Sequence, residues 1–117
     1  MAETNGRESA MEPEELDRLF LERANAQDVD GVVALYEPDA VMSSTRGPLR
    51  GTAAIRLFYQ DLLSDPPFFA GDIQPALRHG GVALTSTRFA GGATAEIARL
   101  QPDGSWLWIV DQPNVAG

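Results

Sequence analysis

The sequence predicts a single α+β domain, in which three N-terminal helices are followed by an antiparallel sheet. Up to about residue 65, apolar residues recur at the three- and four-residue spacing of amphipathic helices. From Phe68 onward the pattern alternates, and turn residues divide it into about four segments. Its 117 residues suffice for one core but not two. We therefore expect helices that cover one face of a curved sheet.

The composition excludes several classes of function. A formal net charge of -8 opposes nucleic-acid binding, which needs clustered Lys and Arg. No apolar run approaches the roughly 18 residues of a membrane-spanning helix, and the N-terminus lacks the pattern of a signal peptide. The sequence has no Cys, and all nine basic residues are Arg, which excludes disulfides, zinc-thiolate sites and Schiff-base lysines. We expect a cytoplasmic protein without a metal, a cofactor, or a nucleic-acid or membrane partner.

Ordered structure is expected to begin near Pro13. Residues 1–12 are polar and patternless, so we expect a disordered leader ahead of one domain that spans residues 13–117. A first helix follows from Glu14, with acids in its first turn. We interpret the run EPEELD, residues 12–17, as the solvated start of that helix.

Two further helices and a strand candidate complete the first half. Asp28 is expected to cap a second helix, which ends before Pro38. Residues 40–45 form a strand candidate. Thr52 is expected to cap a third helix over residues 52–65. The alternating second half predicts strands over residues 68–78, 82–89, 94–100 and 106–112.

The two acids Glu96 and Asp111 lie on adjacent predicted strands. If Gly91-Gly92 is a two-residue hairpin loop, Thr87 lies opposite Glu96. If Leu100 pairs with Ser105 across the next turn, Ile109 lies opposite Glu96 and Asp111 is its diagonal neighbour on the same face. The opposite face then carries Arg88, Ala95, Ile97, Arg99, Trp106, Trp108 and Val110.

Three stretches resemble the nuclear-transport-factor-2-like superfamily, which includes ketosteroid isomerase and the SnoaL-type polyketide cyclases. They are NAQDVDGVVALYEPDAVM at 25–42, RGPLRGTAAIRLFY at 46–59 and DGSWLWIVDQP at 103–113. The resemblance implies a cone-shaped fold, with three N-terminal helices on the concave face of a curved antiparallel sheet. It also implies an apolar pocket between these layers and a convex face that often forms a homodimer interface.

Carried over residue by residue, the resemblance places Glu96 at the protonated acid of the isomerase's oxyanion hole. Asp111 falls on the same pocket-facing side, and Trp106 and Trp108 fall on the convex side. The isomerase's general base falls at Ser44 and its oxyanion-hole tyrosine at Phe20, so steroid isomerisation is not expected.

The candidate catalytic residues are therefore Glu96 and Asp111. Two close carboxylates in an apolar cavity cannot both ionise easily, so one is expected to act as a general acid and the other as a base. Alternatively, either acid pairs with Arg88 or Arg99, or caps loop amides. The candidate substrate-binding residues are Tyr36, Ser44, Phe58, Tyr59, Thr85, Thr87 and Ile109, of which the tyrosines are also candidates for ordinary core positions.

Two function hypotheses remain open. The first is a cofactor-independent enzyme of the SnoaL-like or ketosteroid isomerase-like type. It would carry out proton transfer, cyclisation or epoxide opening on a small hydrophobic molecule, in secondary metabolism. The second is a non-catalytic binding module for a small apolar ligand. A homodimer is expected in either case.

Overall fold

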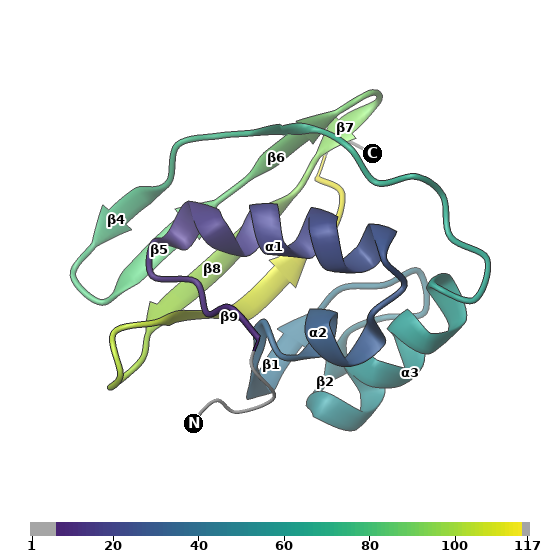
Figure 1. The fold of residues 1–117 in the computed structure, drawn as a ribbon, viewed down its shortest axis with the longest axis horizontal. Helices are drawn as coiled ribbons and strands as arrows, with labels where there is room; N and C mark the ends of the chain where they lie inside the picture. The colour runs from purple at the N-terminus through teal and green to yellow at the C-terminus, as the bar shows by residue number, and fades with distance from the viewer. Residues whose placement is uncertain (1–6, 116–117) are drawn as a thin grey trace.

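The computed structural model describes residues 7–115, which contain three helices and nine strands. The helices are α1 (Pro13–Asn25), α2 (Val29–Val33) and α3 (Thr52–Leu62). The strands are β1 (Tyr36–Met42), β2 (Leu49–Arg50), β3 (Asp72–Ile73), β4 (Leu77–His79), β5 (Val82–Thr85), β6 (Thr87–Phe89), β7 (Gly92–Ala93), β8 (Ala95–Leu100) and β9 (Trp106–Gln112). Figure 1 shows α1 lying across the sheet.

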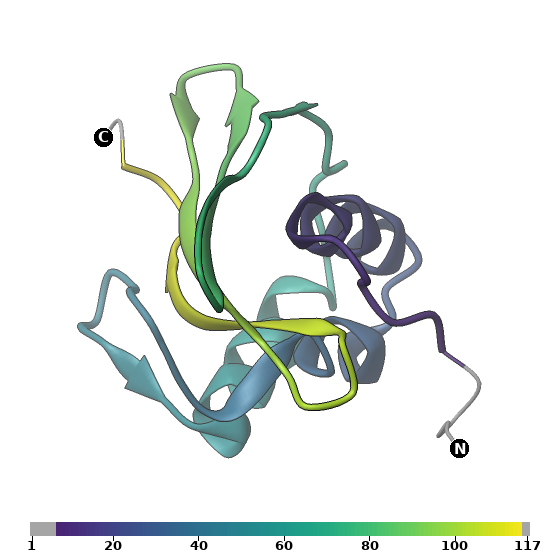
Figure 2. The same cartoon turned by 90° about the vertical axis from the view of Figure 1, so that its left-hand side faces the viewer.

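The sheet is curved, and its helices lie on the concave side. Six strands pair in the order β2-β1-β9-β8-β5-β4, and three short strands pair as β3-β6-β7. Only Ser86 separates β5 from β6, and only Thr94 separates β7 from β8, so one long hairpin contributes to both sets. Figure 2 shows the bend of the strands around α1. The α+β fold class is confirmed.

One pairing differs from the expected all-antiparallel sheet. Strands β1 and β9 are parallel, whereas the other pairs are antiparallel. The chain leaves β1 through α3 and returns by successive hairpins, so its last strand runs beside β1 in the same direction. Such a parallel pair requires a long crossover connection, which α3 and the intervening strands provide.

The helix termini follow local sequence signals. Helix α1 begins with Pro13 at its first turn and with a capping box between Glu12 and Glu15. The Asp28 carboxylate accepts a hydrogen bond from the Gly31 amide at 3.0 Å, as predicted for the second helix. Helix α3, however, is preceded by Gly51 at φ 91° rather than capped by Thr52, which is its first helical residue.

Residues 7–12 contact the domain, unlike the expected leader. Ala10 is buried, and its carbonyl accepts a hydrogen bond from the Trp106 amide at 2.8 Å. Arg7 forms an ion pair with Asp28 at 3.0 Å. Residues 1–6, the remainder of the expected leader, lie outside the described residues.

Two boundaries differ from the sequence-based expectation. Helix α2 ends at Val33, and the following strand starts at Tyr36 and includes Pro38. Since a proline disfavours helical geometry in the residue before it, the chain is extended well ahead of residue 40. The expected strand over residues 68–78 is also wrong in extent, because only β3 and β4 are extended within it.

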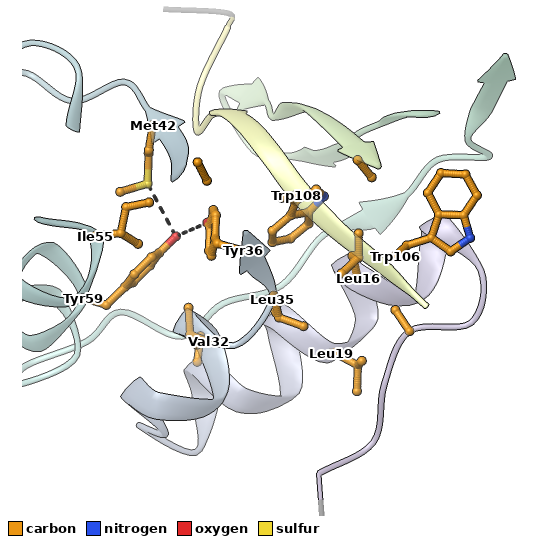
Figure 3. Packing of buried hydrophobic residues seen from close by; sticks show 14 of the residues in the cluster. Leu16, Leu19, Val32, Leu35, Tyr36, Met42, Ile55, Tyr59, Trp106 and Trp108 are labelled. Carbon is orange, nitrogen blue, oxygen red and sulfur yellow. Dashed lines mark hydrogen bonds between the residues drawn. The ribbon is translucent and has the colours of Figure 1, made fainter. Parts of the chain in front are cut away.

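A β-bulge in β9 places both tryptophans on the concave face, which corrects the expectation that they face outward. Ala98 pairs with Trp108 and Ile97 with Val110, so Ile109 is the extra residue. Trp106 and Trp108 are 5% and 2% exposed. Figure 3 shows Trp108 beside Tyr36, with their ring centroids 5.3 Å apart. The bulge lets the Trp pair and Asp111 share one face.

Because adjacent residues of β8 face opposite sides of the sheet, substitutions at Ala98 and Ile97 should change the stability by different amounts. Ala98 is 0% exposed on the concave face, so Ala98→Leu should overpack the core and lower the free energy of unfolding by about 1–3 kcal/mol. Ile97 is 38% exposed on the convex face, and Ile97→Leu should change it by less than about 0.5 kcal/mol. Urea unfolding measures both. Equal losses would contradict the assigned facing.

Candidate active site

A cavity of about 950 Å³ lies between α1, α3, residues 67–72 and the sheet. Its walls are mainly aromatic and aliphatic, and they include Phe20, Leu21, Phe58, Tyr59, Leu62, Phe69, Phe89 and Trp108. Phe20 contacts Tyr59, Phe69 and Trp108, with ring centroids 5.6–6.3 Å apart. The side chains that line this space thus come from both layers of the fold.

Residues 67–72 form one side of the cavity mouth. The side-chain amide of Asn25 holds this segment by two hydrogen bonds to the backbone of Phe69, both at 2.8 Å. A side chain at Gly71 would clash with Thr87, because its Cβ would lie 2.6 Å from the Thr87 methyl carbon. In Figure 1 the connection that contains this segment runs from α3 along the top of the view toward β4.

Three carboxyl groups lie together at the inner end of the cavity. Glu96 on β8 and Asp111 on β9 are directly paired across the two strands, rather than diagonal neighbours. Asp17 reaches the same place from α1. All three are buried, with exposed fractions of 4%, 6% and 3% for Glu96, Asp111 and Asp17. The concave face thus presents an acidic cluster to an otherwise apolar space.

The β5–β8 register explains the neighbour of Glu96. The hairpin turns at Ala90-Gly91 instead of Gly91-Gly92, so Thr85 lies opposite Glu96 where Thr87 was expected. The pairing is displaced by two residues, which leaves the side chains of β5 and β8 on their expected faces. The Thr85 hydroxyl donates to Glu96 Oε1 at 2.6 Å and accepts from Trp108 Nε1 at 3.1 Å. Trp108 therefore orients the donor to Glu96.

The bonds from Trp108 to Thr85 and from Thr85 to Glu96 form one hydrogen-bond relay, and a second relay reaches Asp111. The Tyr36 hydroxyl donates to Asp111 Oδ2 at 2.5 Å and lies 2.7 Å from the Tyr59 hydroxyl. The second bond joins the two hydroxyls, and either of them can be the donor. Figure 3 shows the two tyrosines meeting beside Met42, whose sulfur is 3.7 Å from the Tyr59 hydroxyl. Both tyrosines are core residues and also connect to the acidic cluster.

Asp17 was missed by the sequence analysis, which assigned it to a solvated helix start. It is buried instead, and its Oδ2 has no hydrogen-bond partner among the described residues. One signal was present in the sequence. Asp17 lies four residues after Pro13 and three before Phe20, so it falls on the inward stripe of α1.

Burial raises the pKa of all three carboxyls above the ordinary values. Desolvation, with a smaller contribution from the neighbouring Glu96 carboxylate, raises the pKa of Asp111 to about 7, although the hydrogen bond from Tyr36 lowers it in part. Desolvation also raises the pKa of both Asp17 and Glu96. A hydrogen bond between these two carboxyls lowers the pKa of Asp17 and raises that of Glu96, as expected for a pair that shares a proton. The cluster therefore retains protons near neutral pH.

The remaining predicted site residues divide into three groups. Phe58, Tyr59 and Thr87 line the cavity. Tyr36 and Thr85 lie behind it and contact the acids. Ser44 and Ile109 do not reach it: Ser44 donates to the Gly47 carbonyl at 2.7 Å in the β1–β2 turn, and Ile109 is the bulge residue.

Arginine does not neutralise this cluster. Arg99 forms a bidentate pair with Glu37, with N···O distances of 2.9 and 2.7 Å, so the alternative in which it pairs with Glu96 or Asp111 is wrong.

In the described part of the chain, no group of three or more His, Cys, Asp or Glu side chains is arranged to hold a metal ion. No helix within residues 7–115 is long and apolar enough to cross a membrane.

Comparison with known proteins identifies the family. Residues 18–112 match the model of the SnoaL-like domain, so the chain belongs to this family. A ketosteroid isomerase-like protein from Erwinia carotovora atroseptica is similar in structure, with a TM-score of 0.72, 19% identity, and coverage of 85% of this chain and 89% of that one. An NTF2-like protein of unknown function from Pseudomonas putida KT2440 has a TM-score of 0.65, 16% identity, and coverage of 84% and 80%.

A third similar structure, a protein of unknown function from Nostoc punctiforme with a cystatin-like fold, has a TM-score of 0.64. It is 19% identical, and the match covers 84% of each chain. The resemblance to the nuclear-transport-factor-2-like superfamily, and to its SnoaL-like group, is confirmed. At these identities the solved structures establish the fold.

The raised pKa values predict a loss of stability as the pH rises. The pKa of Asp111 is about 7 in the folded protein against an ordinary value of 3.8, so the folded state binds more protons between these values. The contribution of Asp111 to the free energy of unfolding is complete below about pH 4 and is lost as the pH rises through about 7. Urea unfolding from pH 5 to 8 should show a decline that Asp111→Asn reduces by up to about 1.4 kcal/mol per pH unit.

The exposed Asp39 provides a control for this measurement. Asp39→Asn should leave the decline from pH 5 to 8 unchanged, since that side chain is in contact with water. A wild-type stability that rises over this range would contradict the burial of protonated acids.

Proposed function

We propose that this protein is a cofactor-independent acid–base enzyme that acts on a small hydrophobic molecule. The reaction class is proton transfer, cyclisation or epoxide opening, in secondary metabolism and in the cytoplasm. The observation that carries the proposal is the convergence of Glu96, Asp111 and Asp17 at the inner end of an apolar cavity. Family membership supports the fold and the small-molecule setting of the proposal.

The proposed roles follow from the two relays. Glu96 in its protonated form acts as the general acid, and it donates its proton to an oxygen of the substrate. Asp111 in its ionised form acts as the general base, and it removes a proton from carbon or from an attacking hydroxyl. The electron pair released at the base side moves through the substrate toward the oxygen that Glu96 protonates. Thr85 and Tyr36 orient the two carboxyls, and the aromatic walls exclude water.

A binding module is the second candidate function. It is favoured by the hydrogen bonds that Glu96 and Asp111 already make to Thr85 and Tyr36, because satisfied polar groups are common in structural networks. In that case the cavity would hold a small apolar ligand without turnover. The two candidates differ in whether bound molecules exchange protons.

Two simple substrates test the enzyme proposal. Exchange of the α-protons of 2-tetralone in D2O, followed by proton NMR, measures proton transfer, and hydrolysis of styrene oxide measures epoxide opening. The proposal expects the wild-type protein to accelerate at least one of these reactions with saturation. If both compounds bind but neither reacts faster than in buffer, the binding module is supported instead.

Variants assign the roles. Asp111→Asn and Glu96→Gln should each lower the rate of the accelerated reaction by about 10²–10⁴-fold, because each removes one proton-transfer group. Ser44→Ala is the matched control, since Ser44 lies in the β1–β2 turn and should leave the rate unchanged. Thermal unfolding of each variant checks that it is folded. Unchanged rates in both acid variants would remove the proposed mechanism.

The proposal also includes a homodimer through the convex face. Leu77, Leu84, Ile97 and Val110 are 37–71% exposed and lie side by side across β4, β5, β8 and β9. Such a contiguous apolar row is typical of an association surface. These residues take the place of the two tryptophans, which the sequence analysis had assigned to this face.

Sedimentation tests the dimer. Leu84→Arg would place like charges across a two-fold interface, so it should convert a wild-type dimer to a monomer at 50 µM. Leu57→Arg, at a 66% exposed position on α3, should leave the association state unchanged. A monomeric wild-type protein at this concentration would remove this part of the proposal.

A further inference from the structure

The acidic cluster is unusual because its neighbours supply no positive charge. Among the described residues, Glu96 is hydrogen-bonded to the side chains of Thr85, Thr94 and Asp17, and Asp111 to the Tyr36 hydroxyl, none of which is cationic. Six arginines are engaged elsewhere with carboxylates or carbonyls: Arg7, Arg18, Arg23, Arg56, Arg78 and Arg99. Arg88 lines the cavity mouth but is exposed to solvent. The cluster therefore lacks a built-in counter-ion.

Asp17 supplies an unused hydrogen-bond acceptor in this cluster. The side chain is 3% exposed and lines the cavity, and its Oδ2 has no hydrogen-bond partner among residues 7–115. A buried acceptor without a donor destabilises the protein. A bound molecule that donates a hydrogen bond at this position would remove the deficit.

The walls next to the cluster are suited to a cation. Phe20, Phe58 and Trp108 line the same cavity as Asp17. Aromatic faces attract ammonium groups, and the attraction is greater where water is excluded. A carboxylate ligand would instead face three buried acids without a cation to pair with. The formal net charge of -8 also favours the approach of cations over anions.

We propose that the cavity binds an apolar, ring-containing molecule that carries a protonated amine, with an ammonium N–H donated to Asp17 Oδ2. This inference rests on the site of the proposed function and names the chemical class of its ligand. The hydrocarbon part occupies the aromatic cavity, and the ammonium group provides the counter-ion that the three carboxyls lack. The substrate of the proposed reaction then carries an amine, or develops positive charge at this position.

The proposal implies that binding releases protons. Near neutral pH the raised pKa values leave protons on the cluster, and an ammonium ion favours the ionised carboxylates. Binding of the cation therefore displaces carboxyl protons to the buffer, while the amine keeps its own. A neutral ligand of the same shape has no reason to release them.

Three probes that share a naphthalene ring test the charge preference: 2-naphthylmethylamine, 2-naphthylmethanol and 2-naphthoate. Calorimetric titration of the full-length protein at pH 7.5 should give an affinity for the amine at least tenfold above that for the alcohol, with the naphthoate weakest. Repeating the amine titration in buffers of different ionisation enthalpy should show net proton release. The alcohol should show none.

A matched pair of variants locates the interaction. Asp17→Asn should reduce the preference for the amine over the alcohol to below about threefold. Asp61→Asn removes the same charge from an exposed position on α3, outside the lining of the cavity, and should retain the preference. Thermal unfolding verifies that both variants are folded. If Asp17→Asn does not fold, proton release by the wild-type protein decides the question.

The proposal is overturned if the alcohol or the naphthoate binds as tightly as the amine, if no probe binds at 1 mM, or if amine binding releases no protons. It is also overturned if the two variants lose the preference equally. These outcomes are distinct from a failure of the proposed function, which is measured as turnover of neutral substrates. An amine-selective protein without turnover would retain this inference and support the binding module.

Discussion

The burial of Glu96 beside Asp111 beneath α1 is the constraint on which the rest of the site depends. Two directly paired acids on adjacent strands repel each other when both are ionised, and burial makes each charge more unfavourable. The structure compensates with hydroxyl donors from Thr85 and Tyr36 and with retained protons, rather than with arginine. Protonation is therefore part of how this protein folds.

The β-bulge at Ile109 makes this arrangement compatible with a packed core. In a regular strand, Trp106, Trp108 and Asp111 could not all face the helices, because side chains alternate. The extra residue resets the alternation, so Trp108 packs against Tyr36 and donates to Thr85 while Asp111 still faces Glu96. One irregularity thus connects the aromatic core to both acid relays.

The sequence predicted the fold class and the shared face of Glu96 and Asp111, because hydrophobic period and turn residues are local properties. It did not predict the bulge, which depends on packing of the tryptophans against α1, and it therefore placed Trp106 and Trp108 on the wrong face. Ser44 and Ile109 were misplaced for the related reason that exact turns and registers are tertiary outcomes. The burial of Asp17 was accessible from its place on the helical stripe, but its charge favoured the solvated interpretation.

A purely structural role does not account for all three acids. A well-packed hydrophobic replacement of a buried charged group is often neutral or stabilising, so retaining three carboxyls in one apolar region opposes stability. The hydrogen bonds of Glu96 and Asp111 would fit a structural network, but Asp17 Oδ2 has no partner within the described residues. This acceptor lies next to a cavity of about 950 Å³, and a ligand there that donates a hydrogen bond would remove the cost of leaving it unpaired. Asp17, more than the strand acids, therefore supports the proposal of a ligand site over that of a polar core.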